Sequence, residues 1–131
     1  MPTKTKIKIL LADDHQVVRM GLAAIIAAES DLQLVGEAND GNEAVKFARE
    51  LNPDVILMDL MMPQMDGQEA ARAIRESSTE DAREIPIIAL TADAFDDLEQ
   101  KCFEAGMDGY LKKPIDTDEL FRVLAREFDK R

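Results

Sequence analysis

The chain has 131 residues, which is long enough for one domain with a buried core. Its formal net charge of −11 makes it too acidic for nonspecific binding to nucleic acid. A single cysteine, Cys102, excludes an internal disulfide framework and suits a reducing compartment. No apolar stretch approaches the roughly 20 residues of a membrane span, and the first residues lack the apolar core of a signal peptide, so we expect a cytoplasmic location and no membrane contact.

Short apolar runs alternate with amphipathic segments in the first half of the chain. The runs are typical of buried strands in a parallel sheet, and the amphipathic segments are typical of helices that cover it. In chain order we expect a strand at Lys6–Leu11, a helix at Gln16–Ala28, an edge strand at Leu32–Val35, a helix at Asn42–Leu51 and a central strand at Val55–Met58. The apolar stripe of the first helix, which we expect to face the sheet, consists of Val17, Val18, Leu22, Ile25 and Ile26.

The same alternation continues in the second half. We expect a helix that starts near Gly67, a strand at Ile85–Leu90, a helix at Asp93–Ala105 that stops at Gly106, a strand at Gly109–Leu111 and a last helix at Thr117–Phe128. Five strands, each followed by a helix, predict an α/β fold with a doubly wound parallel sheet in the order 2-1-3-4-5. We expect residues 1–131 to form a single domain, with its core at about 6–128 and no second, output domain.

Polar residues stand where four of the apolar runs end. Asp13 and Asp14 follow the first strand, Asp59 the third, Thr91 the fourth and Lys113 the fifth. Since chemistry in open α/β sheets collects at the carboxyl ends of the strands, we expect these side chains to share one crevice. Carboxylates are the ligands that Mg²⁺ prefers, and a lysine and a hydroxyl suit a phosphoryl group.

Asp59 is the expected nucleophile, because a carboxylate can accept a phosphoryl group to form an acyl phosphate. Lys113 is the expected partner of that group, whereas Lys112 is expected to face away. Other interpretations stay open: Asp13 or Asp14 can cap the following helix, and a lysine viewed alone is most often solvated. For His15, the only histidine, we expect a local polar or capping role.

The chain resembles the receiver domain of two-component response regulators, which has a flavodoxin-like fold. The resemblance covers about Lys6 to Phe128. It rests on four motifs, which are Leu11-Ala-Asp13-Asp14-His15, Met58-Asp59-Leu-Met-Met-Pro63-Gln-Met-Asp66-Gly67, Leu90-Thr91-Ala92 and Lys112-Lys113-Pro114.

The resemblance implies a role for each of these positions. It implies that Asp59 is the phosphoacceptor and that Mg²⁺ is bound by Asp14, by Asp59, by the backbone carbonyl of Met61 and, mostly through water, by Asp13. Lys113 and Thr91 would contact the phosphoryl group, and Thr91 and Tyr110 would form a switch pair.

The resemblance also implies partners. The phosphodonor would be a histidine kinase or a histidine phosphotransfer protein. The receiver would catalyse its own phosphorylation and dephosphorylation without being an enzyme for another substrate. Its output would be a population shift of the face made by the fourth helix, fifth strand and fifth helix, read by a downstream protein or by a second copy, so that the chain is a monomer or a phosphorylation-linked homodimer.

Two alternatives come from other classes. A phosphorylation-independent, receiver-like interaction module would need none of the site residues, yet all of them are present. A dehalogenase-type phosphatase would need an aspartate at Met61. Within the family, the segment around His15 resembles receivers that precede a DNA-binding domain, and the segment from Cys102 to Ile115 resembles receivers of hybrid sensor kinases.

Overall fold

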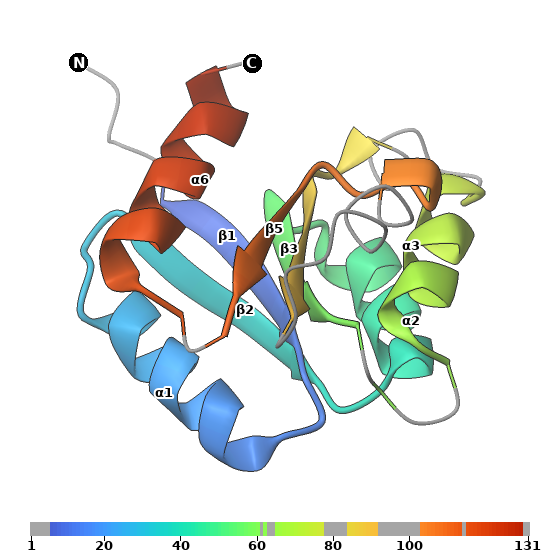
Figure 1. The fold of residues 1–131 in the computed structure, drawn as a ribbon, viewed down its shortest axis with the longest axis horizontal. Helices are drawn as coiled ribbons and strands as arrows, with labels where there is room; N and C mark the ends of the chain where they lie inside the picture. The colour runs from blue at the N-terminus through green and yellow to red at the C-terminus, as the bar shows by residue number, and fades with distance from the viewer. Residues whose placement is uncertain are drawn as a thin grey trace.

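A parallel five-stranded sheet carries helices on both faces (Figure 1). The structure, a computed structural model, describes residues 6–60, 62, 65–77, 84–91, 103–113 and 115–129. The strand order is β2-β1-β3-β4-β5, as predicted. The strands are β1 (Ile7–Ala12), β2 (Leu32–Ala38), β3 (Val55–Asp59), β4 (Ile87–Thr91) and β5 (Gly109–Lys112). The helices are α1 (Gln16–Ala27), α2 (Gly41–Leu51), α3 (Gly67–Arg75) and α6 (Thr117–Asp129).

Alternation along the buried strands produces two apolar clusters, one on each face of the sheet. On one face Leu10, Ile56 and Met58 pack with residues of α2 and α3, and on the other Leu11 and Leu57 pack with residues of α1 and α6. Neighbouring strand residues point to opposite faces, so an unbroken apolar run fills both clusters. In Figure 1 the pair α1 and α6 accordingly lies on the other side of the sheet from α2 and α3.

Three predicted details are wrong, and each has a physical reason. The second strand runs to Ala38 instead of ending at Val35, because Gly36, Glu37 and Ala38 still pair with the last residues of β1. The fourth strand begins at Ile87 instead of Ile85, because Pro86 has no N–H to donate to a ladder. Val17 does not face the sheet and is 81 % exposed. It lies nine residues from the buried Ile26, which corresponds to half a rotation around a helix of 3.6 residues per turn.

Local signals account for the helix ends. Asp66 caps α3 by accepting from the backbone N–H of Glu69, whose side chain accepts from the Asp66 N–H in return. Gly106 has φ of +100°, which glycine adopts without the strain of a Cβ, in agreement with a helix stop there. Most of the helix predicted at Asp93–Ala105 lies outside the described residues. No helix in the described part of the chain is long and apolar enough to cross a membrane.

Candidate functional site at the carboxyl ends of the strands

The sheet order brings the polar strand ends together. Asp13 follows β1, Asp59 ends β3, Thr91 ends β4 and Lys113 follows β5, and these four strands are neighbours in the sheet. Their side chains are withdrawn from solvent: Asp13 is fully buried, Asp59 is 2 % exposed and Thr91 is 6 % exposed. Burial of two carboxylates side by side is costly unless a cation accompanies them.

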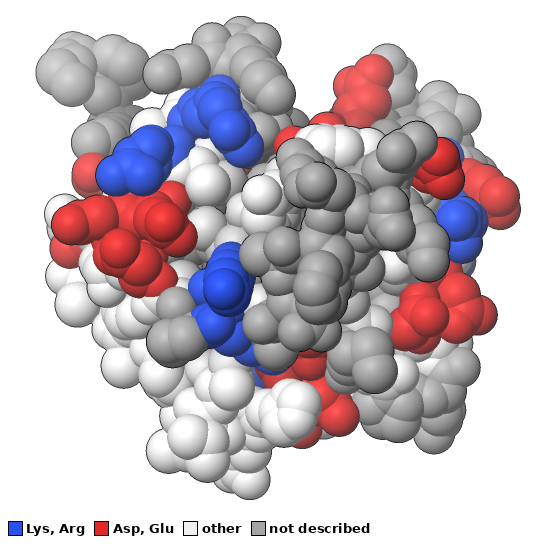
Figure 2. Space-filling view, viewed as in Figure 1, with Lys and Arg blue, Asp and Glu red and all other residues white. Residues whose placement is uncertain are grey.

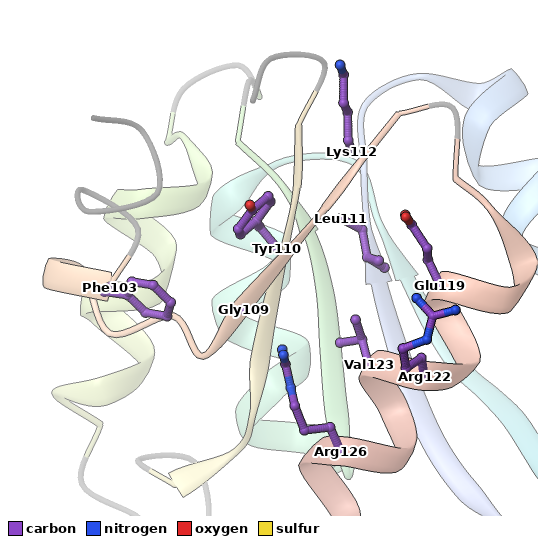
Figure 3. A pocket seen from close by; sticks show the side chains of 9 residues that line it. All are labelled: Phe103, Gly109, Tyr110, Leu111, Lys112, Glu119, Arg122, Val123 and Arg126. Carbon is purple, nitrogen blue, oxygen red and sulfur yellow. The ribbon is translucent and has the colours of Figure 1, made fainter. Parts of the chain in front are cut away.

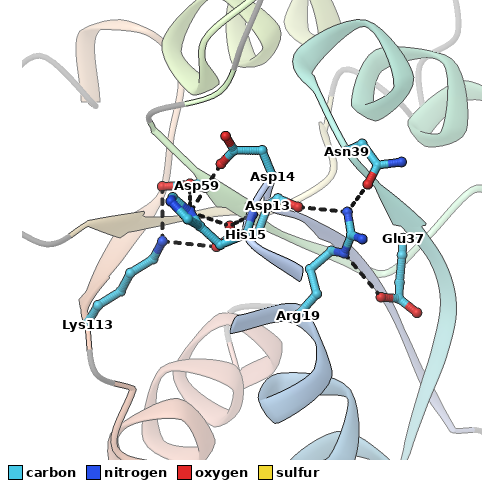
Figure 4. A network of polar contacts seen from close by, with 8 residues as sticks. All are labelled: Asp13, Asp14, His15, Arg19, Glu37, Asn39, Asp59 and Lys113. Atoms are coloured by element: carbon cyan, nitrogen blue, oxygen red, sulfur yellow. Dashed lines mark hydrogen bonds and ion pairs between the residues drawn. The ribbon is translucent and has the colours of Figure 1, made fainter. Parts of the chain in front are cut away.

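Lys113 is the cation that the chain itself supplies. Its Nζ lies 3.0 Å from Asp13 Oδ2 and 3.3 Å from Asp59 Oδ1 (Figure 4). Burial is the largest influence on the pKa of Lys113 and lowers it, but the hydrogen bond to Asp13 and the charges of Asp59 and Asp13 together outweigh it, so that the pKa is raised. Lys113 therefore carries its charge at neutral pH. Lys112, as predicted, faces away from the cluster: it is exposed, on the side of β5 opposite to the buried Leu111.

The aspartates form a cluster that suits a divalent cation. One ligand atom from each of Asp13, Asp14, Asp59 and His15 lies within 4.8 Å of the others. Three carboxylates against one ammonium leave a formal charge of −2, and hard oxygen donors suit Mg²⁺. The residues present thus fit the ion that the sequence motif implies. Met61, the expected carbonyl ligand, lies outside the described residues.

His15 lies at the start of α1 beside the aspartates, in agreement with the expected local polar role. It is the N-cap residue of α1, but its side chain makes no capping hydrogen bond, so the capping role is wrong. Its Nδ1 instead lies 3.2 Å from Asp13 Oδ1, 3.2 Å from Asp14 Oδ1 and 3.7 Å from Asp59 Oδ2. Asp13 does not cap α1 either; it accepts from the His15 N–H at 2.8 Å, one residue ahead of the helix.

Arg19, in the first turn of α1, makes hydrogen bonds to the backbone of Asp13 and to the side chain of Asn39. Its Nη1 donates to the backbone carbonyl of Asp13 at 3.0 Å and to the side-chain oxygen of Asn39, and its Nε lies 3.5 Å from Glu37 (Figure 4). Arg19 therefore joins the ends of β1 and β2. Arg19 lies in the first turn of α1, where its backbone N–H donates to the carbonyl of the N-cap residue His15.

Tyr110 lies away from the cluster, in a groove between β5 and α6. Tyr110 is 38 % exposed, and Figure 3 shows its ring on the opposite side of β5 from Leu111. The groove has a volume of about 520 Å³ and is lined by Phe103, Gly109, Tyr110, Leu111, Lys112, Glu119, Arg122, Val123 and Arg126. Figure 2 shows Lys and Arg gathered along α6 and at the end of β5, beside acidic groups of the first turn of α6.

Comparison with known families identifies the class of protein. Residues 9–125 match the model of the response regulator receiver domain. Together with the sheet order and the aspartate cluster, this match shows that the chain belongs to the receiver domain family of response regulators.

Individual relatives are named regulators. The chain is 49 % identical over 115 residues to the transcriptional regulatory protein LiaR of Bacillus subtilis, covering 87 % of this chain and 52 % of LiaR. It thus spans about half the length of the curated relatives that it matches.

Solved structures give the same fold. A two-component response regulator of the LuxR family from Aurantimonas sp. SI85-9A1 has a TM-score of 0.87 at 34 % identity, over 97 % of this chain and 88 % of that one. The receiver domain of the sensor histidine kinase PA1611 from Pseudomonas aeruginosa, with a magnesium ion coordinated in its active site cleft, has a TM-score of 0.82 at 38 % identity, over 93 % and 97 %. The proteins that this chain resembles therefore include both a transcriptional regulatory protein and the receiver domain of a sensor histidine kinase.

Proposed function

We propose that this chain accepts a phosphoryl group on Asp59 from a histidine kinase or a histidine phosphotransfer protein. The observation that carries the proposal is a buried Asp59 carboxylate 3.3 Å from the Lys113 ammonium, within the cluster of Asp13 and Asp14. An Asp59 oxygen attacks phosphorus, the bond from phosphorus to the donor imidazole nitrogen breaks, and the electron pair leaves with that nitrogen. The product is an acyl phosphate on Asp59.

The residues around Asp59 orient the reaction and neutralise its charge. Lys113 pairs with an oxygen of the incoming phosphoryl group, and Thr91 offers its hydroxyl to another. Mg²⁺, held by Asp14, Asp59 and the Met61 carbonyl, with Asp13 acting through water, would supply positive charge to the phosphoryl oxygens. Dephosphorylation is the attack of water on phosphorus, which returns inorganic phosphate and the free carboxylate.

The proposed output is a shift in population of the groove face. Thr91 moves toward the phosphoryl oxygen and Tyr110 turns inward, which changes the groove that a downstream protein or a second copy of the chain binds. Because the chain resembles transcriptional regulatory proteins and sensor-kinase receivers, we further propose a cytoplasmic location and a receiver core at about residues 6–128.

Intact-mass spectrometry after incubation with acetyl phosphate, with and without Mg²⁺, tests this function. We expect a gain of one phosphoryl mass that needs Mg²⁺ and is absent in Asp59→Asn. The matched control is Asp118→Asn, which neutralises an exposed aspartate on α6 and should be phosphorylated like the wild type. A folded wild-type protein that gains no mass in Mg²⁺ would favour a phosphorylation-independent interaction module.

A further inference from the structure

Arg19 is a mostly buried arginine that reaches the aspartate cluster through the backbone of the chain. Its side chain is 15 % exposed. Its Nη1 donates to the carbonyl oxygen of Asp13 at 3.0 Å and to the side-chain oxygen of Asn39, and its Nε lies 3.5 Å from Glu37 (Figure 4). Withdrawing a guanidinium from water is costly unless its N–H groups are used, so these contacts fix the side chain in one place.

Pairing of the strands does not require this arginine. The backbone ladder joins β1 to β2 as far as Ala12 and Ala38, and the Asp13 N–H continues it by donating to the Ala38 carbonyl at 3.1 Å. The next backbone group along the chain is the Asp13 carbonyl, and that is the group to which Arg19 donates. The arginine therefore holds the chain at the point where the sheet no longer does.

Holding the Asp13 backbone on both sides determines where its carboxylate lies. The N–H is held by β2 and the carbonyl by Arg19, which leaves the Cα–Cβ bond of Asp13 a single direction. The carboxylate is fully buried, with Oδ2 at 3.0 Å from the Lys113 ammonium and Oδ1 accepting the His15 N–H at 2.8 Å. Residues that orient a metal-binding group in this way commonly contribute about tenfold or more to metal affinity.

We propose that Arg19 is a positioning residue of the site, which acts through the Asp13 backbone to aim the Asp13 carboxylate at Mg²⁺ and at Lys113. The proposal rests on the function proposed above, in which Asp13 serves Mg²⁺ through water, and it adds the residue that keeps Asp13 in place. Arg19 acts by its shape, because a guanidinium reaches one acceptor from Nη1 and another from Nε at once, which the single ammonium of a lysine cannot do. Its charge works in the opposite direction, since a cation near the cluster repels a second cation.

Titration of the metal-free protein with MgCl₂, followed by amide ¹H–¹⁵N NMR, separates shape from charge. We expect the Mg²⁺ dissociation constant to rise about tenfold in both Arg19→Lys and Arg19→Met. A role through charge alone predicts otherwise: Arg19→Lys would bind Mg²⁺ like the wild type, and Arg19→Met would bind it more tightly. Either of those two results would overturn the proposal.

Arg49→Met is the matched control for lost stability. Arg49 stands in the last turn of α2, at the end opposite to the N-cap, and its Nε donates to the Ser77 side chain at 3.0 Å. We expect this variant to lose stability in urea without any change in its Mg²⁺ dissociation constant. An Arg49→Met protein that loses as much Mg²⁺ affinity as Arg19→Met would show that the effect belongs to stability in general, and would refute a positioning role.

Asn39→Ala tests the same role at an exposed residue, where folding is not at risk. It removes one acceptor of Arg19, so we expect the Mg²⁺ dissociation constant to rise in the same direction by a smaller factor. In the double variant with Arg19→Met we expect no further rise, because Asn39 acts through Arg19. Wild-type affinity in Asn39→Ala would contradict the proposal. Mg²⁺ binding is measured without phosphorylation, so a wild type that binds the ion yet is not phosphorylated on Asp59 would end the proposed function alone.

Discussion

The charge distribution at the strand ends predicts that Asp59→Asn raises the free energy of unfolding when divalent cations are absent. The attraction between Asp59 and Lys113, 3.3 Å apart, is about 5 kcal/mol at an effective dielectric constant of about 20. The ligand atoms of Asp13 and Asp14 lie within 4.8 Å of that of Asp59. Each of these two repulsions is then about 3.5 kcal/mol or more on the same scale.

The two repulsions exceed the attraction by about 2 kcal/mol, and the substitution also removes the cost of burying a carboxylate. Solvent reduces the share of Asp14, whose side chain is 31 % exposed. We therefore expect Asp59→Asn to be more stable than the wild type by about 1–2 kcal/mol, which corresponds to a rise of several degrees in Tm.

Urea unfolding in EDTA, followed by circular dichroism, measures this difference. In saturating MgCl₂ we expect the difference to shrink, because Mg²⁺ stabilises the wild type by mass action and binds the variant more weakly. Asp118→Asn serves as the control and should stay within about 0.5 kcal/mol of the wild type in both buffers. A lower free energy of unfolding for Asp59→Asn in EDTA would refute the view that repulsion dominates the cluster.

Three further predictions concern residues around the site and the sheet. Arg75 donates to the carbonyls of Gly106 and Ile85 and pairs with Asp108 at 2.8 Å, so Arg75→Met should lower the free energy of unfolding in urea by about 2–4 kcal/mol, and a loss below about 0.5 kcal/mol would contradict this. A Cβ on Gly67 would meet the Asp59 carbonyl oxygen at 2.5 Å; we expect Gly67→Ala to slow phosphorylation by acetyl phosphate, and a rate equal to that of the wild type would exclude this displacement. Because the pKa of Lys113 is raised in the folded state, its stabilising contribution is complete below the unfolded value of about 10.4 and is lost as the pH rises through the folded value. The stability difference between wild type and Lys113→Met should therefore stay constant from pH 7 to about pH 10 and narrow only above it, whereas narrowing near pH 8 would disprove the raised pKa.

The sheet and the strand ends were predictable because the information is local. An apolar run such as Val55–Met58 is too short and too uniform for a surface helix, and the residue that follows it must lie at the carboxyl edge of the sheet. Once β1, β3, β4 and β5 are neighbours, Asp13, Asp59 and Lys113 meet without further assumptions.

Contacts that depend on side-chain direction were not predictable. The ring of His15 has several rotamers at the start of a helix, and only the positions of three carboxylates from two strands select the one observed. Arg75 donates to Asp108, which lies 33 residues further along the sequence, and no pattern in either segment predicts this pair. Periodicity places a residue on a face, whereas its partner is decided by packing between elements.

Lys113 is the residue that connects Asp59 with the strand that borders the groove, β5. The Lys113 side chain contacts Asp59, and its backbone N–H donates to the Thr91 carbonyl at 2.7 Å, so Lys113 joins β3, β4 and β5 at the site. Tyr110 lies three residues away on β5, on the groove side. Phosphorylation of Asp59 would change the electrostatic surroundings of Lys113, whose ammonium lies 3.3 Å from that carboxylate. Lys113 therefore links the Asp59 carboxylate to β4 and β5, the strands that carry the proposed switch residues Thr91 and Tyr110.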